Sequence, residues 1–491
     1  MENWLIALLI IGLYLVLALV IGMLAGYKRD FYSLEEFAVT HRNMSLFLMW
    51  VMMGGAIFSA SAFLGTPGWA FSQGAACFYL LAYPSMGLLP WYIIGPKLAR
   101  LGKKKQLLTL GHFAGIRYNS RVLSVIVGAV AIFAFIQYLA LQIKGSAYIF
   151  NIMTEGHISY NLAAVLMYGI VIVYVATGGL RAAAWSDVLQ SGLMIVVAWG
   201  LGLYLPWKLW GGIGPMFQNI VATKPGFLQI GVEGALMSKN AFSTAILVSV
   251  IGFIMWPHLF SKTFVTEPRK IKQTVAIYPL FALIMLPVVL IGFSAVGKVD
   301  PTAIKTADQI LPYLTTHLLG ASGFLLGVIG AAALAASMSS ADAITHGAAV
   351  EFTQDIYRTF KPKASEKEVV IVMRLAVVII GLFALYVALF GAASIVALLL
   401  GAYGSIVQFA PLVYGGLYWR KASKQGAIAG LVAGILVNTY LQVILKKNPL
   451  EINAGIWGLL VNLLIFIVVS MILKSSLNKT DVEAAEETIT A

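Results

Sequence analysis

The stretch MMGGAIFSASAFLGTPG, residues 52–68, places two adjacent glycines, Gly54 and Gly55, inside a long apolar run. Glycine destabilises a helix interior because it loses more backbone freedom on folding than other residues. A second apolar run, VIGFIMWPHLF at residues 250–260, carries Gly252 and Pro257, and proline removes a backbone donor from a helix. Each of these runs is therefore predicted to be a helix that breaks near its middle.

The composition predicts that these helices cross a membrane. Of 491 residues, 60% are hydrophobic and 11% are charged, whereas an ordinary soluble domain has about 25% charged residues. The single cysteine, Cys77, excludes an intrachain disulfide and a cysteine-based metal site. A span needs roughly 20 mostly apolar residues. We predict an all-α polytopic membrane protein with thirteen transmembrane helices, at 3–26, 46–72, 75–96, 121–150, 160–177, 183–207, 241–261, 273–297, 321–357, 368–391, 393–418, 425–445 and 455–474.

Lysine and arginine in the loops predict the orientation, because positively charged loops stay in the cytoplasm. Most of the 33 Lys and Arg residues lie in one alternating set of loops, including Lys28, Arg29 and Lys474. The amino terminus is therefore predicted outside and the carboxyl terminus inside, with the protein in the cell membrane. The net charge of +13 is interpreted as this topology signal, with no nucleic-acid partner. The acidic tail LNKTDVEAAEETITA, 477–491, is predicted to be disordered.

The two interrupted runs start five spans apart. A unit of five helices has odd parity, so a second copy enters the membrane upside down. Interrupted helices at corresponding places in two inverted halves are typical of a transporter's binding site. The alternative is that the glycines and the proline make ordinary kinks.

The run LAASMSSADAITH, residues 334–346, carries the next signal. Ala336, Ser339 and Ser340 are spaced i, i+3, i+4 and share one helix face. Two neighbouring hydroxyls can hold a small hard cation if backbone carbonyls complete its shell, and the break at GGAIF supplies such carbonyls. A neutral, all-oxygen site suits sodium, since a divalent ion prefers carboxylates. The alternative is that the serines pack at helix crossings and bond to their own helix.

Five stretches carry a resemblance to the sodium/solute symporters, the family of the sodium/proline, pantothenate, monocarboxylate and glucose carriers. They are FSASAFLGTPGWAFSQG (58–74), GGLRAAAWSDVLQSGLM (178–194), WPHLFSKTF (256–264), AAALAASMSSADAITHGAAVEFTQDIYR (331–358) and LYWRKAS (417–423). The resemblance implies a LeuT-type 5+5 inverted repeat with one helix before and two after. The expected parts are 1–45, an extra helix and first cytoplasmic loop; 46–207, the first repeat; 208–240, an external loop; 241–418, the second repeat; 419–475, two last helices; and 476–491, the tail.

The resemblance also implies the ligands. Sodium is expected at the carbonyls of Gly55, Phe58 and Ala336 and the hydroxyls of Ser339 and Ser340. The matching substrate positions are Ser59, Ser61, Ala62, Phe253, Trp256, Pro257, Tyr403 and Gln408.

The small residues of FSASAF disfavour a sugar, which needs many polar partners, and suit a small organic acid or amino acid. Lys144 lies inside the fourth span, where a cation is a functional hypothesis by default. It pairs with a substrate carboxylate or extends to the outer surface. The run LALQIKG is closest to the monocarboxylate branch.

Two carboxylates have more than one interpretation. Asp342 is a further cation ligand, a proton-linked site, or the partner of His346 at i+4. Asp187 lines the inner sodium exit, as the resemblance implies, or bonds to nearby backbone or Arg181.

These observations predict a sodium-coupled symporter that imports a monocarboxylate or other small organic acid by alternating access, with a monomer sufficient. A sodium/proline-type, a sodium/pantothenate-type and a proton-coupled carrier are the alternatives. An enzyme is not expected, because the six histidines form no His-Glu-x-x-His pair.

Overall fold

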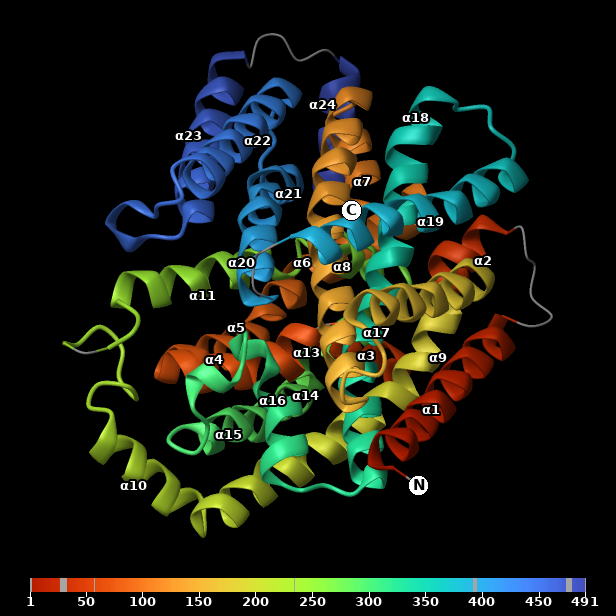
Figure 1. Ribbon diagram of the computed structural model, residues 1–491. Helices are drawn as coiled ribbons and strands as arrows, with labels where there is room; N and C mark the ends of the chain where they lie inside the picture. The colour runs from red at the N-terminus through yellow and green to blue at the C-terminus, as the bar shows by residue number, and fades with distance from the viewer. Residues whose placement is uncertain are drawn as a thin grey trace.

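The computed structural model describes residues 2–26, 33–56, 58–233, 235–391, 395–473 and 479–490 (Figure 1). The regular secondary structure of the described residues is entirely helical, with no β-strand. Twelve helical segments among them are long and apolar enough to cross a membrane, and a shorter apolar helix, α3 (Leu46–Gly55), accompanies them. The all-helical membrane class is therefore confirmed. The exact count of thirteen is not confirmed, because α3 is shorter than a span and Ser61–Lys105 forms one helical segment.

The long helices begin and end close to the predicted limits, except that α9 (Tyr160–Trp210) joins two predicted spans in one helix. All except the central α17 (Gly323–Glu351) bury part of their surface on their neighbours and leave a wide apolar face exposed, as expected in lipid. The other long helices are α1 (Asn3–Gly26), α8 (Arg121–Met153), α19 (Glu366–Phe390), α22 (Lys424–Thr439) and α23 (Ala454–Ile472).

Helix α9 contains two of the predicted spans in one helical segment. The backbone leaves helical geometry at Gly179, where φ is +57°, so the segment bends between the spans. A Cβ at Gly179 would lie 2.9 Å from the ring of Phe37. Both the positive φ and the close approach of Phe37 explain why glycine stands at this bend.

Both predicted breaks are present. Helix α3 ends at Gly55, and the helix resumes at Ser61 as a π-helical turn, η2 (Ser61–Gly65), followed by α4 (Thr66–Gln73). Ile57 lies outside the described residues. In the seventh run, α11 (Lys239–Phe253) ends before Trp256, and α12 (Pro257–Ser261) and the 3₁₀ turn η4 (Lys262–Phe264) follow.

The remaining helices complete the spans and connect them. The spans contain α5 (Tyr79–Gly87), α6 (Leu89–Lys105), α13 (Pro268–Ile277), α14 (Pro279–Ala282), α15 (Met285–Ala295), α20 (Ile395–Ile406), η9 (Val407–Phe409) and α21 (Ala410–Tyr418). Short helices not predicted from the sequence lie between spans, at α2 (Leu34–Val39), α7 (Leu110–Arg117), α10 (Ile213–Thr223) and α16 (Ile310–Tyr313).

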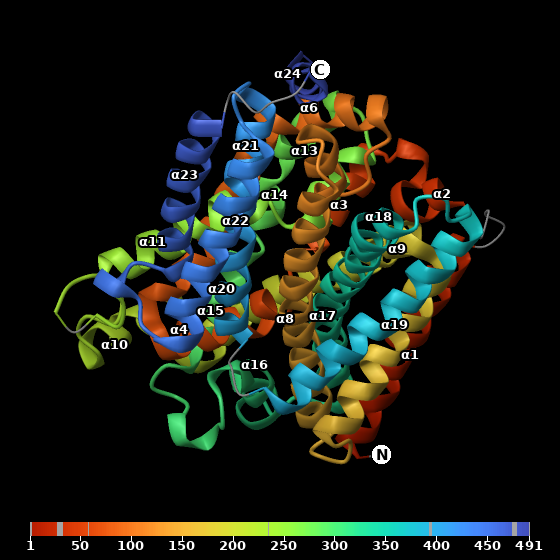
Figure 2. The same ribbon diagram turned by 90° about the horizontal axis from the view of Figure 1, so that it is seen from above.

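Helix α17 lies at the centre of the bundle and contacts α1, α8, α9 and α19 (Figure 2). Most of its length is buried, unlike the peripheral helices α1 and α23. Its sequence has small residues at most positions, which allows neighbouring backbones to approach closely. The serine cluster therefore lies deep inside the protein.

The prediction of a disordered tail is wrong for its described part. Residues Lys479–Thr490 form helix α24, which lies against α7 and α21. Glu487 pairs with Lys105, and the carbonyl of Ile489 accepts a hydrogen bond from Lys97. The acidic helix thus neutralises basic side chains at the end of α6, a tertiary contact that composition alone does not reveal. Lys28, Arg29 and Lys474 lie outside the described residues.

Candidate functional site

The serine hydroxyls of α17 meet the carbonyls of the broken second run. The Ser339 hydroxyl donates to the Gly55 carbonyl at 3.0 Å. The Ser340 hydroxyl lies 3.3 Å from the same carbonyl and 3.1 Å from that of Ala56. Both serines are fully buried. Four oxygens from segments about 280 residues apart in the chain therefore converge at one point.

The break makes these carbonyls available. In an uninterrupted helix the Ala56 carbonyl would accept from the amide of Ala60, but that amide donates to the side chain of Gln142 at 2.9 Å. The Ala56 carbonyl accepts from Ser340 and, at 3.4 Å, from the Tyr138 hydroxyl. The carbonyls at the end of α3 thus point at side chains of other helices.

Four of the five predicted sodium ligands lie together. The Ser339 hydroxyl also lies 3.2 Å from the Ala336 carbonyl, which joins this residue to Gly55 and the two serines. Phe58 is different: its backbone N–H donates a hydrogen bond to the Gly54 carbonyl and its ring centroid lies 4.9 Å from that of Phe281, and its carbonyl accepts no hydrogen bond from the serines among the described residues.

Sequence reasoning missed Ala56 and Tyr138. Ala56 follows Gly55 directly in GGAIF, so its carbonyl could have been included with those of the break. Tyr138 had no sequence signal, because only the packing of α8 against the break brings its hydroxyl there.

The predicted substrate residues form two adjoining groups. The hydroxyls of Ser59 and Ser61 lie 2.6 Å apart just after the first break. At the second break, the Trp256 ring contacts Tyr138 at 4.7 Å and Tyr403 at 5.5 Å between centroids. Tyr138 therefore touches both the hydroxyl–carbonyl cluster and the aromatic group.

Three other predicted residues border these groups. The ring centroids of Phe253 and Tyr83 lie 6.2 Å apart, and the Tyr83 ring also contacts that of Tyr403. Pro257 begins α12 directly after Trp256. Ala62 lines a gap with Phe58 and Tyr83 that is too narrow for a water molecule.

Gln408 does not face this region. Its amide nitrogen donates to the carbonyls of Gly404 and Gly455, each at 3.0 Å, and Asn462 donates to its side-chain oxygen at 3.2 Å. These partners lie on α20 and α23. The side chain therefore joins helices, and the structure does not bring it to the first break.

Lys144 lies beside the last residues of α19. Its ammonium donates to the Gly391 carbonyl at 3.0 Å and interacts electrostatically with Asp308. Asp308 also accepts from the amide of Ile395 at 3.2 Å. Burial raises the pKa of Asp308, while the Ile395 amide and Lys144 oppose that rise.

The two ambiguous carboxylates, Asp187 and Asp342, are fully buried near the hydroxyl–carbonyl cluster. They interact electrostatically with each other and with Lys262, whose ammonium donates to the Met52 carbonyl at 2.8 Å. Asp187 has no hydrogen-bond partner for either oxygen among the described residues. Lys262 directly follows the predicted span 241–261, at a position expected to face water, so its burial was not predicted from the sequence.

The alternatives raised for these carboxylates involve two other side chains. Arg181 pairs with Glu36 at 2.7 Å, so its guanidinium is engaged away from Asp187. The His346 ring nitrogen lies 2.8 Å from the Phe37 carbonyl.

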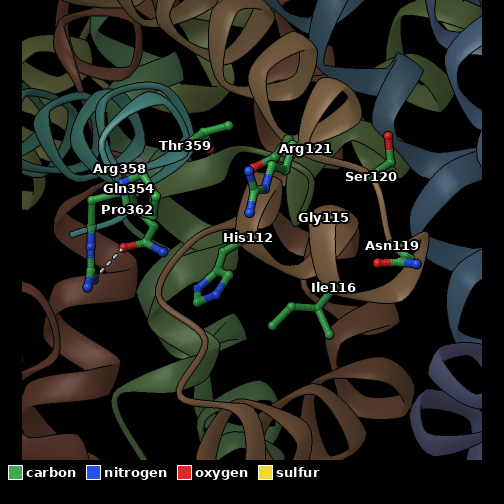
Figure 3. A pocket seen from close by; sticks show the side chains of 11 residues that line it. His112, Gly115, Ile116, Asn119, Ser120, Arg121, Gln354, Arg358, Thr359 and Pro362 are labelled. Atoms are coloured by element: carbon green, nitrogen blue, oxygen red, sulfur yellow. Dashed lines mark hydrogen bonds between the residues drawn. The ribbon is translucent and has the colours of Figure 1, made fainter. Parts of the chain in front are cut away.

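A separate pocket of about 560 Å³ opens beside α7, the start of α8 and the segment after α17 (Figure 3). His112 points into it, with Arg121 and Arg358 nearby. Burial and the charges of Arg358 and Arg42 lower the pKa of His112 to about 4. None of the predicted site residues lines this pocket.

Comparisons with known proteins agree with this architecture. The uncharacterized symporter YhjB of Bacillus subtilis is 32% identical, with 98% of this chain and 99% of that protein covered. The monocarboxylate transport permease protein of Rhizobium johnstonii is 24% identical over 95% and 97% of the two chains. A sodium-coupled sialic acid symporter in a substrate-bound outward-open state has a TM-score of 0.78 at 17% identity, covering 95% of this chain and 98% of its own.

The similarity in sequence is not confined to one segment. Residues 37–434 match the model of the sodium:solute symporter family, and this range includes both breaks, the serine cluster and the buried carboxylates. The predicted LeuT-type fold is confirmed by the structural similarity. The chain belongs to the sodium:solute symporter family.

Proposed function

We propose that this protein imports a monocarboxylate or other small organic acid together with sodium by alternating access. Family membership supports sodium symport of a small solute, and the identity of the solute is our inference. The amino terminus is proposed to lie outside and the carboxyl terminus in the cytoplasm, as the loop charges indicate. Figure 2 draws the two chain ends on opposite faces of the bundle, which suits this arrangement.

The contact of Ser339 and Ser340 with the Gly55 and Ala56 carbonyls carries the sodium part of the proposal. A hydroxyl can donate to a carbonyl or turn its lone pairs toward a cation. The same oxygens could therefore exchange their mutual hydrogen bonds for a small cation between them. Because they belong to α17 and to the broken run, a bound ion would hold these two elements together.

The solute is proposed to bind between the Ser59–Ser61 hydroxyls and the aromatic group of Trp256 and Tyr403. Such surroundings offer two small polar contacts and a large apolar surface. A small acid with a short carbon chain fits this chemistry better than a sugar.

The coupling has an energetic consequence. Each charge crossing about 100 mV gains roughly 2.3 kcal/mol. One sodium moving inward with a neutral solute therefore gains that amount, whereas one sodium with a monoanion gains nothing from the voltage. The sodium concentration gradient would then drive uptake of a monocarboxylate, and stoichiometry decides how far it can be accumulated.

Uptake into proteoliposomes tests the proposal. Labelled lactate, pyruvate, acetate, proline and pantothenate would be offered with a sodium gradient, with a proton gradient, or with neither. We expect sodium-dependent uptake of a monocarboxylate. Uptake driven equally well by a proton gradient without sodium would overturn the sodium coupling and favour the proton-coupled alternative. If only proline or only pantothenate were taken up with sodium, the proposed solute would be wrong and the corresponding alternative carrier would be favoured.

Lys144 provides a second test of the solute site. If its ammonium attracts the carboxylate of an incoming solute, Lys144→Gln raises the solute concentration for half-maximal uptake by roughly tenfold, as expected for the loss of a charge-assisted contact. Asp308→Asn is the matched control, since it leaves the cation in place and removes its acidic neighbour. An unchanged constant in Lys144→Gln would remove this residue from the solute site.

A further inference from the structure

Lys262 is the starting point of this inference. It follows α12, the inner half of the broken seventh run, and only 2% of its surface is exposed. Its ammonium donates to the Met52 carbonyl at 2.8 Å, in the last turn before the other break. One cation therefore connects the two interrupted helices. Burying a lysine is expensive unless opposite charges lie close by.

The opposite charges are Asp187 of α9 and Asp342 of α17. Lys262 bonds to Met52 and Asp187 sits against Gly55, two positions one turn apart at the end of α3. Asp342 lies one turn from Ser339, which bonds to the Gly55 carbonyl, so the three charges interact electrostatically across this end of α3. The three side chains therefore come from three separate helical elements. With all three ionised, the cluster carries one net negative charge.

This cluster borders the proposed sodium site directly. A Cβ at Gly55 would lie 2.8 Å from Asp187 Oδ1, so the carboxylate sits against the residue whose carbonyl meets both serines. Asp342 lies one helical turn from Ser339 on α17. A sodium ion at the serines would thus neutralise the remaining negative charge of the cluster.

The net charge of the cluster becomes more negative if Lys262 is absent. Two buried carboxylates would then face one sodium ion, leaving an uncompensated buried charge, which is strongly destabilising. Carboxylate oxygens are good ligands for hard cations. The missing positive charge can come from a proton on one carboxylate or from a second sodium ion, and the neighbouring oxygens of Gly55 and Ser339 favour the ion.

We propose that Lys262 is a built-in cation at a second cation site formed by Asp187 and Asp342, so that the carrier binds one sodium ion with this lysine and two without it. The inference rests on the proposed sodium site at Ser339 and Ser340. It makes Lys262 a residue that sets the number of coupling ions.

Equilibrium binding of ²²Na⁺ to the purified full-length protein tests the number of ions. We expect one ion per protein in the wild type and in Lys262→Arg, and two in Lys262→Met. The double variant Lys262→Met/Asp342→Asn returns to one. A folded Lys262→Met protein that binds a single ion would overturn the inference, since the carboxylates would then be neutralised by a proton. No saturable binding to the wild type would instead refute the proposed sodium site.

A charge-exchange test remains decisive if Lys262→Met does not fold. In Asp342→Asn the cluster is neutral before sodium binds, so the sodium concentration for half-maximal uptake should rise roughly tenfold or more. Adding Lys262→Met restores the net charge and should reverse most of that loss. A purely structural role for either residue predicts additive damage, so a double variant no better than Asp342→Asn would contradict the proposal.

Discussion

The two interrupted helices differ in what surrounds their breaks. At the first, the carbonyls of Gly55 and Ala56 face hydroxyls of Ser339, Ser340 and Tyr138. At the second, the ring of Trp256 lies among other aromatic rings, including those of Tyr138 and Tyr403. The same backbone feature thus occurs once in a polar setting and once in an aromatic one.

The difference suggests a division of labour. Unwound backbone within a membrane protein is tolerated where it is buried in protein or lines a cavity. Hydroxyl and carbonyl oxygens suit a small cation, whereas aromatic faces suit the apolar part of an organic solute. Tyr138 touches both settings, so a change at one break can reach the other through its side chain.

The largest expected effect comes from removing both hydroxyls at the first break. Charge-assisted contacts contribute about 1.5–3 kcal/mol each, so Ser339→Ala/Ser340→Ala should raise the sodium concentration for half-maximal uptake by roughly a hundredfold or more. Sodium titration of uptake measures this change. Ser337→Ala is the control, because the Ser337 hydroxyl bonds to the Ala333 carbonyl of its own helix. Equal effects in both proteins would remove the serine pair from the ion site.

Replacing one glycine at each break by alanine tests whether the first break binds sodium and the second binds the solute. A Cβ at Gly55 would lie 2.8 Å from Asp187 Oδ1, and one at Gly252 would lie 3.1 Å from the Tyr403 ring. Overpacking a buried site costs about 1–3 kcal/mol, so we expect roughly tenfold changes. Gly55→Ala should raise mainly the sodium concentration for half-maximal uptake. Gly252→Ala should raise mainly the solute concentration for half-maximal uptake, called the solute constant below. The reverse pattern, measured by titrating each ligand, would break the comparison.

A smaller effect is expected at the aromatic group. Aromatic contacts contribute about 0.5–1.5 kcal/mol beyond their buried area, so Trp256→Phe should raise the solute constant several-fold at saturating sodium. Trp91→Phe is the control. Trp91 is fully buried and donates to the Thr263 hydroxyl at 2.8 Å, so its loss should lower thermal stability without changing the solute constant. If Trp91→Phe changed the solute constant and Trp256→Phe did not, Trp256 would not be part of the solute site.

The smallest effect should lie away from both breaks, at His112. Its pKa in the folded protein is about 4, against an ordinary 6.5, because of burial and of the charges of Arg358 and Arg42. The unfolded chain binds the proton more readily, so this contribution to stability is present above about pH 6.5 and is lost as the pH falls through 4. As the pH is lowered over that range, the melting temperature of the wild type should therefore decrease more steeply than that of His112→Asn. Parallel curves would show that His112 is not buried as a neutral ring.

Local sequence patterns were sufficient for the membrane class, for most of the spans and for the two breaks. Apolar runs must be helical in lipid, where each backbone group has to be satisfied within its own segment. Gly54, Gly55 and Pro257 act on the backbone of their own helix, so their effect is visible without knowing its neighbours. The pairing of Ser339 and Ser340 with the break was predicted from their oxygen chemistry, and the resemblance supplied the set of five ligands, four of which the fold brings together.

Only the tertiary structure decided which side chains share a site. Gln408 and Lys262 are both polar residues whose neighbours cannot be read from the chain. Gln408 joins α20 to α23, whereas Lys262 is buried on the Met52 carbonyl and interacts electrostatically with two carboxylates. The acidic tail folds as α24 because Lys97 and Lys105 lie beside it. Such contacts depend on how distant helices pack, and electrostatic and hydrogen-bond partners hundreds of residues apart leave no local pattern. The sequence by itself determined where the helices cross and break, whereas packing determined what each break faces.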